Sequence, residues 1–410
     1  MLRNRASFVV LVAALGYFVD LYDLVLFSIL RVPSLTALGV AKESLTSTGA
    51  YLLNLQLAGM MLGGVLLGVL GDRRGRLTVV FGSIVLYSLA NLANAFVTTV
   101  FAYALCRFVA GFGLAGELGA GITLVAELLP KERRGVGTTI VASVGLTGAL
   151  AAGALGELLI HRFGPDGFRY AYGLGGVMGL LLLVLRVGLL ESALFDKARR
   201  GDAPRGDLRM LLSPFSRFVR FLRVVMVGMP IWYVGGVIFI FAPEIGAALG
   251  LTERPTGGNT IFYAYLGVVL GDVASGALSQ VLKSRKRVIG GCLVLLAASV
   301  VALLTFGGRS MSLFYGLMTL VGFATGYWVL FVTTASEQFG TNLRATVTTS
   351  APNFVRGSAI PISLVWLALK PKLGVVPATL ALGLVCISIG VVALIGMKES
   401  FHAELDVLER

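Results

Sequence analysis

The chain alternates long apolar runs with short polar or charged segments. An apolar run of roughly 20 residues is long enough to cross the hydrocarbon core of a bilayer as a helix. Twelve such runs cover residues 8–30, 49–71, 77–97, 100–126, 136–160, 170–190, 222–247, 260–282, 288–306, 311–336, 345–369 and 375–396. The pattern predicts an all-α integral membrane protein with twelve transmembrane helices.

Composition agrees with this interpretation. Hydrophobic residues make up 57% of the 410 positions and charged residues only 13%, against about 45–50% and about 25% in soluble domains. A soluble chain must carry polar residues on its surface, so a soluble globular protein is excluded. The 53 glycines form no repeating triplet, which excludes collagen and is typical of helices that pack closely in a bilayer.

The net charge of +13 is compatible with nucleic acid or with anionic lipid as a partner, and its distribution favours lipid. Twenty-one Lys and Arg residues lie in loops on one side of the expected membrane and seven on the other. Because cytoplasmic loops are enriched in Lys and Arg, we expect both termini in the cytoplasm. The expected neighbours of this charge are the headgroups of a cell inner membrane.

Cysteine and histidine give no sign of a metal or a cofactor. Cys106, Cys292 and Cys386 lie in three separate runs, and His161 and His402 lie near loops. Neither a disulfide framework nor a metal cluster has this spacing. We expect no metal site and no cofactor other than a coupling ion.

An internal repeat divides the chain. Four residues recur at an offset of 210: Glu127, Arg134, Thr138 and Thr139 reappear as Glu337, Arg344, Thr348 and Thr349. Pro33 and Pro243 differ by the same 210. We expect two pseudo-symmetric six-helix bundles, residues 1–190 and 218–410, joined by a basic cytoplasmic linker over 191–217. This is an architecture of secondary transporters.

The loop after the second run makes the resemblance specific. Gly68-Val-Leu-Gly71-Asp72-Arg73-Arg74-Gly75-Arg76 resembles the loop 2–3 signature of the Major Facilitator Superfamily, with Thr78 where a basic residue is usual. The fourth run, from Arg107 through Glu117 to Glu127, and Asp20-Leu-Tyr22-Asp23 in the first run are similar to the metabolite:proton and aromatic-acid:proton symporter groups. The resemblance implies the fold of that superfamily and proton-coupled transport.

The resemblance also implies a set of gating residues. In the superfamily the loop signature locks the cytoplasmic side, which implies this role for Asp72, Arg73, Gly75 and Arg76. Glu127 and Arg134 are expected to join that network, and Glu337 with Arg344 is expected to be its copy in the second half.

Two acidic residues in the first run suggest how energy is coupled. Asp20 lies about 18 Å into the membrane at 1.5 Å per residue, and Asp23 follows one turn later. A charge at this depth usually faces a cavity or a partner. The pair is therefore a candidate proton carrier, whereas the alternative makes Asp23 a packing partner of an Arg or an amide.

Arg107 and Glu117 on the fourth run are too far apart along one helix, about 15 Å, to pair directly. Each is expected to have a partner on another helix. We assign Arg107 to substrate binding and Glu117 to proton coupling, with simple bonding to a neighbouring helix as the alternative for both.

The second half supplies Arg356 and Asp272 near the midplane. Arg356 with Asn353 predicts an element that recognises an anion, since a guanidinium binds carboxylate or phosphate through two parallel hydrogen bonds. The alternative is a permanent Arg356–Asp272 pair. Further candidates for substrate contact are the aromatic residues Tyr22, Trp232, Tyr233, Tyr327 and Trp328, which alternatively only pack, and the polar residues Asn54, Gln56 and Tyr51.

The sequence is compatible with three classes of function. The first is proton-coupled symport of a small organic anion, the second is proton antiport that exports drugs or metabolites, and the third is a membrane enzyme or receptor. The sequence has no Gly-x-x-x-x-Gly-Lys-Ser/Thr loop, which disfavours transport driven by ATP, and no nucleophile motif. We therefore expect a monomeric transporter of a small molecule, not an enzyme and not a nucleic-acid-binding protein.

Overall fold

The computed structural model describes residues 2–74, 76–115, 131–193 and 214–401. Within these ranges all regular structure is helical and no strand occurs. Eight stretches of the described residues are long and apolar enough to cross a membrane.

The expected runs coincide with helices wherever the structure describes them, and the fourth, 100–126, is described only as far as residue 115. The first half contains α1 (Leu2–Ala37), α2 (Leu45–Arg74), α3 (Arg76–Asn94), α4 (Val100–Leu114), α6 (Lys131–Phe163) and α7 (Gly167–Ala193). The second half contains α9 (Phe215–Tyr233), η3 (Val234–Phe239), α10 (Ala242–Ala248), α11 (Gly257–Val281), α12 (Arg285–Phe306), α13 (Met311–Thr325), α14 (Trp328–Glu337), α15 (Thr341–Gly357), α16 (Ala359–Leu373) and α17 (Val375–Ile395). Short helical turns, η1 (Lys42–Ser44), η2 (Gly164–Asp166) and η4 (Gly307–Arg309), lie in connections.

Three of the expected spans are interrupted. The seventh passes from α9 through a π-helical turn, η3, into α10, and Pro230 lies at the end of α9. The tenth breaks at Gly326, where an added Cβ would lie 2.5 Å from the backbone of α11. The eleventh breaks at Ser358, three residues before Pro361, whose nitrogen has no proton to donate. Broken helices leave backbone groups available inside a membrane protein.

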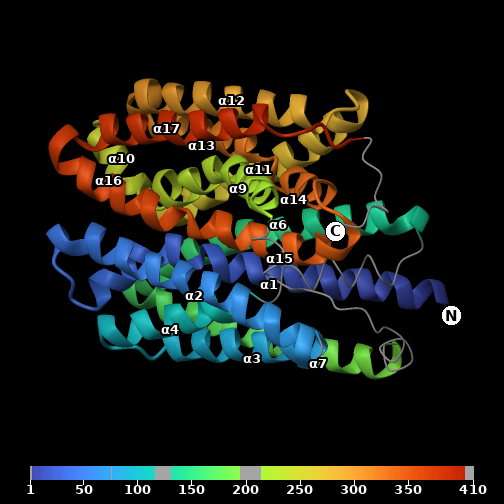
Figure 1. The fold of residues 1–410 in the computed structure, drawn as a ribbon. Coiled ribbons are helices and arrows are strands. Elements are labelled where there is room, and N and C mark those ends of the chain that lie inside the picture. The colour runs from blue at the N-terminus through green and yellow to red at the C-terminus, as the bar shows by residue number, and fades with distance from the viewer. Residues whose placement is uncertain (1, 75, 116–130, 194–213, 402–410) are drawn as a thin grey trace.

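The two halves lie against each other along most of their length. Figure 1 shows α2, α3, α4 and α7 in the lower part of the view, α9, α12, α13 and α17 in the upper part, and α1, α6 and α15 between them. The helices approach closely where α6 meets α11, because a Cβ on Gly153 would lie 2.9 Å from the carbonyl oxygen of Gly258.

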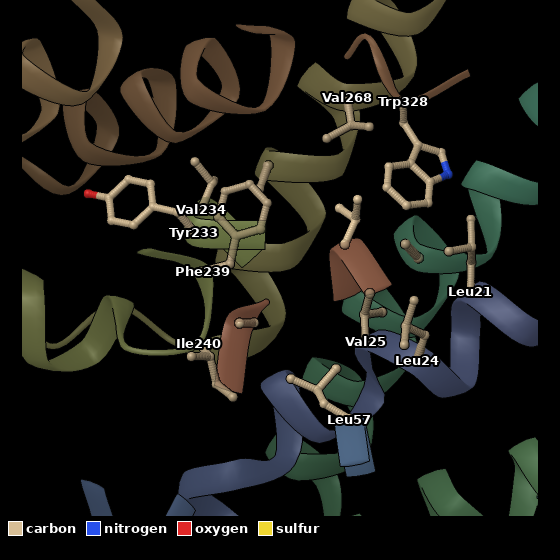
Figure 2. Close-up of a cluster of buried hydrophobic side chains, with 14 of the residues drawn as sticks. Leu21, Leu24, Val25, Leu57, Tyr233, Val234, Phe239, Ile240, Val268 and Trp328 are labelled. Carbon is tan, nitrogen blue, oxygen red and sulfur yellow. The ribbon is translucent and has the colours of Figure 1, made fainter. Parts of the chain in front are cut away.

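Apolar side chains from both halves meet near the middle of the molecule. Leu21, Leu24 and Val25 of α1 and Leu57 of α2 belong to the same buried cluster as Phe239, Val268 and Trp328 of the second half (Figure 2). The few polar and charged side chains among them are therefore held in an apolar setting, as in small-molecule sites.

Candidate functional site

Arg356 on α15 is the central cation of the interface between the halves. It is 4% exposed, its Nη1 donates to Oδ1 of Asn353 at 3.3 Å, and its Cζ lies 5.7 Å from the ring centroid of Trp328. Asn353 in turn donates to the carbonyl oxygen of Ala115 on the first half at 3.4 Å. The Nε of Arg356 has no hydrogen-bond partner within the described chain, so one donor of this buried guanidinium is available.

Three groups with acidic or phenolic oxygens surround Arg356. Asp20 and Tyr17 of α1 and Tyr265 of α11 all interact electrostatically with the guanidinium. Phe239 packs against Tyr265 with 6.2 Å between ring centroids. Arg356 therefore lies among aromatic rings supplied by both halves, which we call the interface cluster: Tyr17, Asp20, Tyr265, Trp328, Asn353 and Arg356.

Asp272 on α11 is at the edge of this cluster and is not paired with Arg356. Its Oδ1 accepts a hydrogen bond from the backbone N–H of Val329 at 3.1 Å, a group that the break between α13 and α14 leaves available. Its Oδ2 has no hydrogen-bond partner among the described residues. The alternative of a permanent Arg356–Asp272 ion pair is therefore wrong, because the broken helix supplies the partner of Asp272.

A second set of buried charged residues lies inside the first half. Asp23 of α1 and Arg107 of α4 are both 0% exposed and interact electrostatically, with Asn91 of α3 beside the same carboxylate. Arg107 Nη1 donates to Oδ1 of Asn91 at 3.3 Å. Arg107 therefore has its partner on other helices, as expected.

Asp20 and Asp23 have different cations as neighbours. Asp20 interacts with Arg356 across the interface, whereas Asp23 interacts with Arg107 within the first half. Residues three apart on a helix lie on the same face, so the different neighbours come from the helices packed around α1. The two carboxylates therefore interact with different arginines.

An ion pair at the end of the molecule opposite the termini joins the halves. Arg31 of α1 donates from Nη2 to Oε2 of Glu244 of α10 at 2.7 Å, and the Thr46 hydroxyl donates to Oε1 of the same carboxylate at 3.0 Å. The Arg31 side chain is 1% exposed, and its Cζ lies 4.9 Å from the ring centroid of Phe241. Nearby, Ser363 of α16 donates to Asn54 of α2 at 2.8 Å. The halves are therefore held together at this end.

Several residues expected to contact substrate are instead packed within one half. The hydroxyls of Tyr22, Tyr233 and Tyr327 donate to the carbonyl oxygens of Ala171, Thr379 and Val227, at 3.2, 2.7 and 3.0 Å, and all three side chains are fully buried. Gln56 is buried where α2 meets α4. Trp232 is half-buried, and Tyr51 is exposed on the outside of the bundle. Of the aromatic candidates, Trp328 is the one that contacts Arg356.

The expected gating network is only partly within the described residues. Gly75, Glu127 and the coupling candidate Glu117 lie outside them, and so do the side chains of Asp72, Arg73, Arg76, Arg134 and Arg344. Glu337 is described, and it pairs with Arg285 at 3.2 Å and accepts from the Ser400 hydroxyl at 2.7 Å. The first residue of α12 thus supplies the partner of Glu337.

Sequence reasoning missed Arg31, Glu244, Tyr17, Tyr265 and Asn91. A signal for the first two was present, because they flank the repeated prolines Pro33 and Pro243 at corresponding span ends. The aromatic and amide partners carry no comparable signal, since isolated Tyr and Asn residues in apolar helices are ordinary.

The sequence model of the Major Facilitator Superfamily matches residues 13–364. The chain is 25% identical over 340 residues, 81% of its own length and 76% of the relative's, to a Cupriavidus pinatubonensis protein named "Probable 4-methylmuconolactone transporter". It is 23% identical over 381 residues, 87% and 80% of the two lengths, to the gentisate transporter of Corynebacterium glutamicum.

The fold has a solved counterpart. The crystal structure of a D-xylose-proton symporter superposes with a TM-score of 0.71 over 97% of this chain and 98% of the other, at 18% identity. The matched family model covers most of the sequence, and the all-helical fold described above agrees with that of the solved structure. The protein is a multi-pass membrane transporter, and the chain belongs to the Major Facilitator Superfamily.

Proposed function

We propose that this protein is a proton-coupled symporter of a small aromatic or unsaturated carboxylate. The observation that carries the proposal is Arg356, a buried guanidinium among aromatic rings whose Nε has no hydrogen-bond partner in the described chain. A carboxylate is the ligand that such a donor recognises best, because charge-assisted hydrogen bonds are about twice as strong as neutral ones. The rings of Tyr17, Tyr265 and Trp328 offer apolar faces to a planar substrate.

The relatives support the same class of substrate. One is named for gentisate and the other for 4-methylmuconolactone, and both compounds are small, unsaturated and carry a carboxylate. The interface cluster contains groups from both halves, so a bound substrate would be released when the halves separate on one side. This is how alternating access operates around a central site.

Asp23 is the proposed proton carrier. Protonation of Asp23 removes the negative charge that faces Arg107, and this charge pair lies apart from Arg356. Asp20 has a different proposed role: its carboxylate interacts electrostatically with Arg356, so an incoming anion competes with Asp20 for the guanidinium. Substrate binding is then accompanied by protonation or displacement of Asp20. Protonation of Asp23 and this change at Asp20 together couple proton movement to substrate movement.

We also propose where the protein lies in the cell and which parts of it move. The excess of Lys and Arg in the loops on the side of the termini supports cytoplasmic termini in a cell inner membrane. Residues 1–190 and 218–410 are proposed to be the moving halves of a monomer, connected by the segment 191–217. No nucleic-acid partner and no cofactor other than H⁺ is proposed.

Uptake into proteoliposomes tests this function. The purified protein is reconstituted with an alkaline interior, and entry of radiolabelled gentisate is followed with and without a protonophore. We expect accumulation that is lost with the protonophore and inhibited by other aromatic carboxylates. Accumulation of a cationic drug in place of gentisate, driven by an acidic interior, would establish the antiport alternative instead.

A further inference from the structure

We propose that Tyr172 and Tyr103 position Arg107 against Asp23 and thereby set the pH at which transport is driven by protons; this inference rests on the proposed proton coupling. Neither tyrosine belongs to the interface cluster, and neither is part of the sequence signature of the family discussed above. Both would act through Arg107, so we describe them as positioning residues.

Tyr172 of α7 holds one side of the guanidinium. The Cζ of Arg107 lies 5.1 Å from the ring centroid of Tyr172, and the two side chains also interact electrostatically through the hydroxyl. The other side of Arg107 donates to Asn91 at 3.3 Å. Nε and Nη2 make no hydrogen bond within the described chain. The place of the cation therefore depends in part on Asn91 and Tyr172, the two side chains that contact the guanidinium directly.

Tyr172 is itself held by a chain of hydroxyl groups. The hydroxyls of Tyr172 and Tyr103 lie 2.7 Å apart, and that of Tyr103 lies 3.2 Å from the hydroxyl of Ser34 on α1. The two rings meet edge to face with 5.8 Å between centroids, and Phe27 packs against Tyr103 at 5.9 Å. Tyr103 and Tyr172 are both 0% exposed. The ring contact and the hydrogen bond with Tyr103 together restrict the orientation of the Tyr172 side chain.

The groups that face Asp23 explain why this position matters. Arg107 comes from α4, Asn91 from α3 and Tyr172 from α7, while Tyr22 and Asp20 neighbour Asp23 on α1 itself. From α11, the titratable groups Asp272 and Tyr265 interact with Tyr17, one further turn along α1. Arg107 is therefore the cation that faces Asp23 among the described residues, and its distance decides how strongly the ionised carboxylate is favoured.

Small changes to the hydroxyl chain are expected to move the pH profile of uptake. In Tyr103→Phe the ring remains and the partner of the Tyr172 hydroxyl is lost, so Arg107 is held less firmly. The ionised form of Asp23 then loses part of its stabilisation and keeps its proton to higher pH. We expect the pH of half-maximal gentisate uptake to rise by about 0.5–1 unit. Tyr172→Leu, which removes ring and hydroxyl, is expected to cause a larger rise.

The experiment measures gentisate uptake between pH 5 and pH 9 in proteoliposomes, with counterflow at each pH as a second readout. Counterflow exchanges substrate without net proton movement, and we expect the Tyr103→Phe variant to keep it within about twofold of wild type. Tyr315→Phe is the control, because its hydroxyl accepts a hydrogen bond from Thr256 N–H at 3.2 Å far from Asp23. Its profile is expected to match wild type.

The outcomes separate this inference from the proposed function. If wild-type uptake does not depend on pH, proton coupling itself is wrong. If wild-type uptake depends on pH but neither Tyr103→Phe nor Tyr172→Leu moves the profile, the positioning role alone is wrong. A shift equal to that of Tyr315→Phe, or equal loss of uptake and counterflow at every pH, would also contradict the positioning role, since a purely structural defect predicts these results.

Discussion

Arg31 of α1 and Glu244 of α10 form an ion pair of 2.7 Å that joins the two halves of the transporter. The Arg31 side chain is 1% exposed and that of Glu244 is 18% exposed, so Glu244 has access to water and Arg31 does not. Removal of one partner leaves the other charge buried without compensation, which is costly. Separation of the halves at this end would relieve that cost by hydrating Arg31.

Glu244→Gln is therefore expected to favour the conformation that is open at this end. We expect a short thiol cross-linker to join Asn54→Cys to Ser363→Cys readily in a background without Cys106, Cys292 and Cys386, because the native side chains lie 2.8 Å apart. With Glu244→Gln added, the cross-linking rate should fall about three- to tenfold, as expected for a bias of about 1 kcal/mol. Glu253→Gln, at an exposed position of the α10–α11 connection, is the control. An unchanged rate with Glu244→Gln would show that this ion pair does not hold the end closed.

Arg356→Gln is expected to weaken substrate binding without unfolding the protein. A charge-assisted hydrogen bond contributes about 1.5–3 kcal/mol, so the half-saturating concentration of gentisate should rise about 10- to 150-fold. Arg309→Gln removes a cation from the α12–α13 connection, outside the interface cluster, and should leave it unchanged. Equal affinity in wild type and Arg356→Gln would exclude Arg356 as the anion site.

Asp23→Asn and Asp20→Asn are expected to differ, because the two carboxylates face different cations. Asp23→Asn should abolish accumulation driven by a pH gradient while gentisate counterflow continues. Asp20→Asn should mainly change the half-saturating concentration, since Asp20 no longer competes with the substrate for Arg356. Identical defects in both variants would support a single carboxylate pair instead.

Glu399, beyond the end of α17, links stability to pH. Burial alone would raise the pKa of this carboxyl, but hydrogen bonds from the Ser284 hydroxyl and the backbone N–H groups of Arg285, Phe401 and Lys286 outweigh it, and the pKa lies below its usual range. Because the folded-state pKa is lowered, the stabilisation is present above the value of an exposed glutamate, about 4.3, and is lost as pH falls through the folded pKa.

Thermal unfolding in detergent checks this link. Glu399→Gln should lower the Tm by about 1–3 °C at pH 7, and the difference from wild type should shrink as the pH falls below about 4.3, the pKa of an exposed glutamate. The same substitution at the exposed Glu253 should have no effect at either pH. A difference that persists at low pH would assign the loss to packing rather than to the carboxylate.

The sequence by itself determined the membrane class, the all-helical fold and the family. These follow from local properties: an apolar run long enough for the bilayer has to form a helix, because no water is present to satisfy its backbone groups. The loop signature around Asp72 and the acidic residues Asp20 and Asp23 could likewise be identified from the sequence alone. So was the pairing of Arg356 with Asn353, because three residues along a helix bring their side chains together.

Partner choice between helices was decided only by the tertiary structure. Asp20 and Asp23 are adjacent on α1, yet the packing of α4 and α15 around it gives each a different arginine. Glu244 is paired with Arg31 across 213 positions of sequence, and Asp272 bonds to a backbone group that exists because the tenth span is broken. Spacing along one helix fixes which side chains share a face, but the identity of the helix opposite that face depends on how all of them pack.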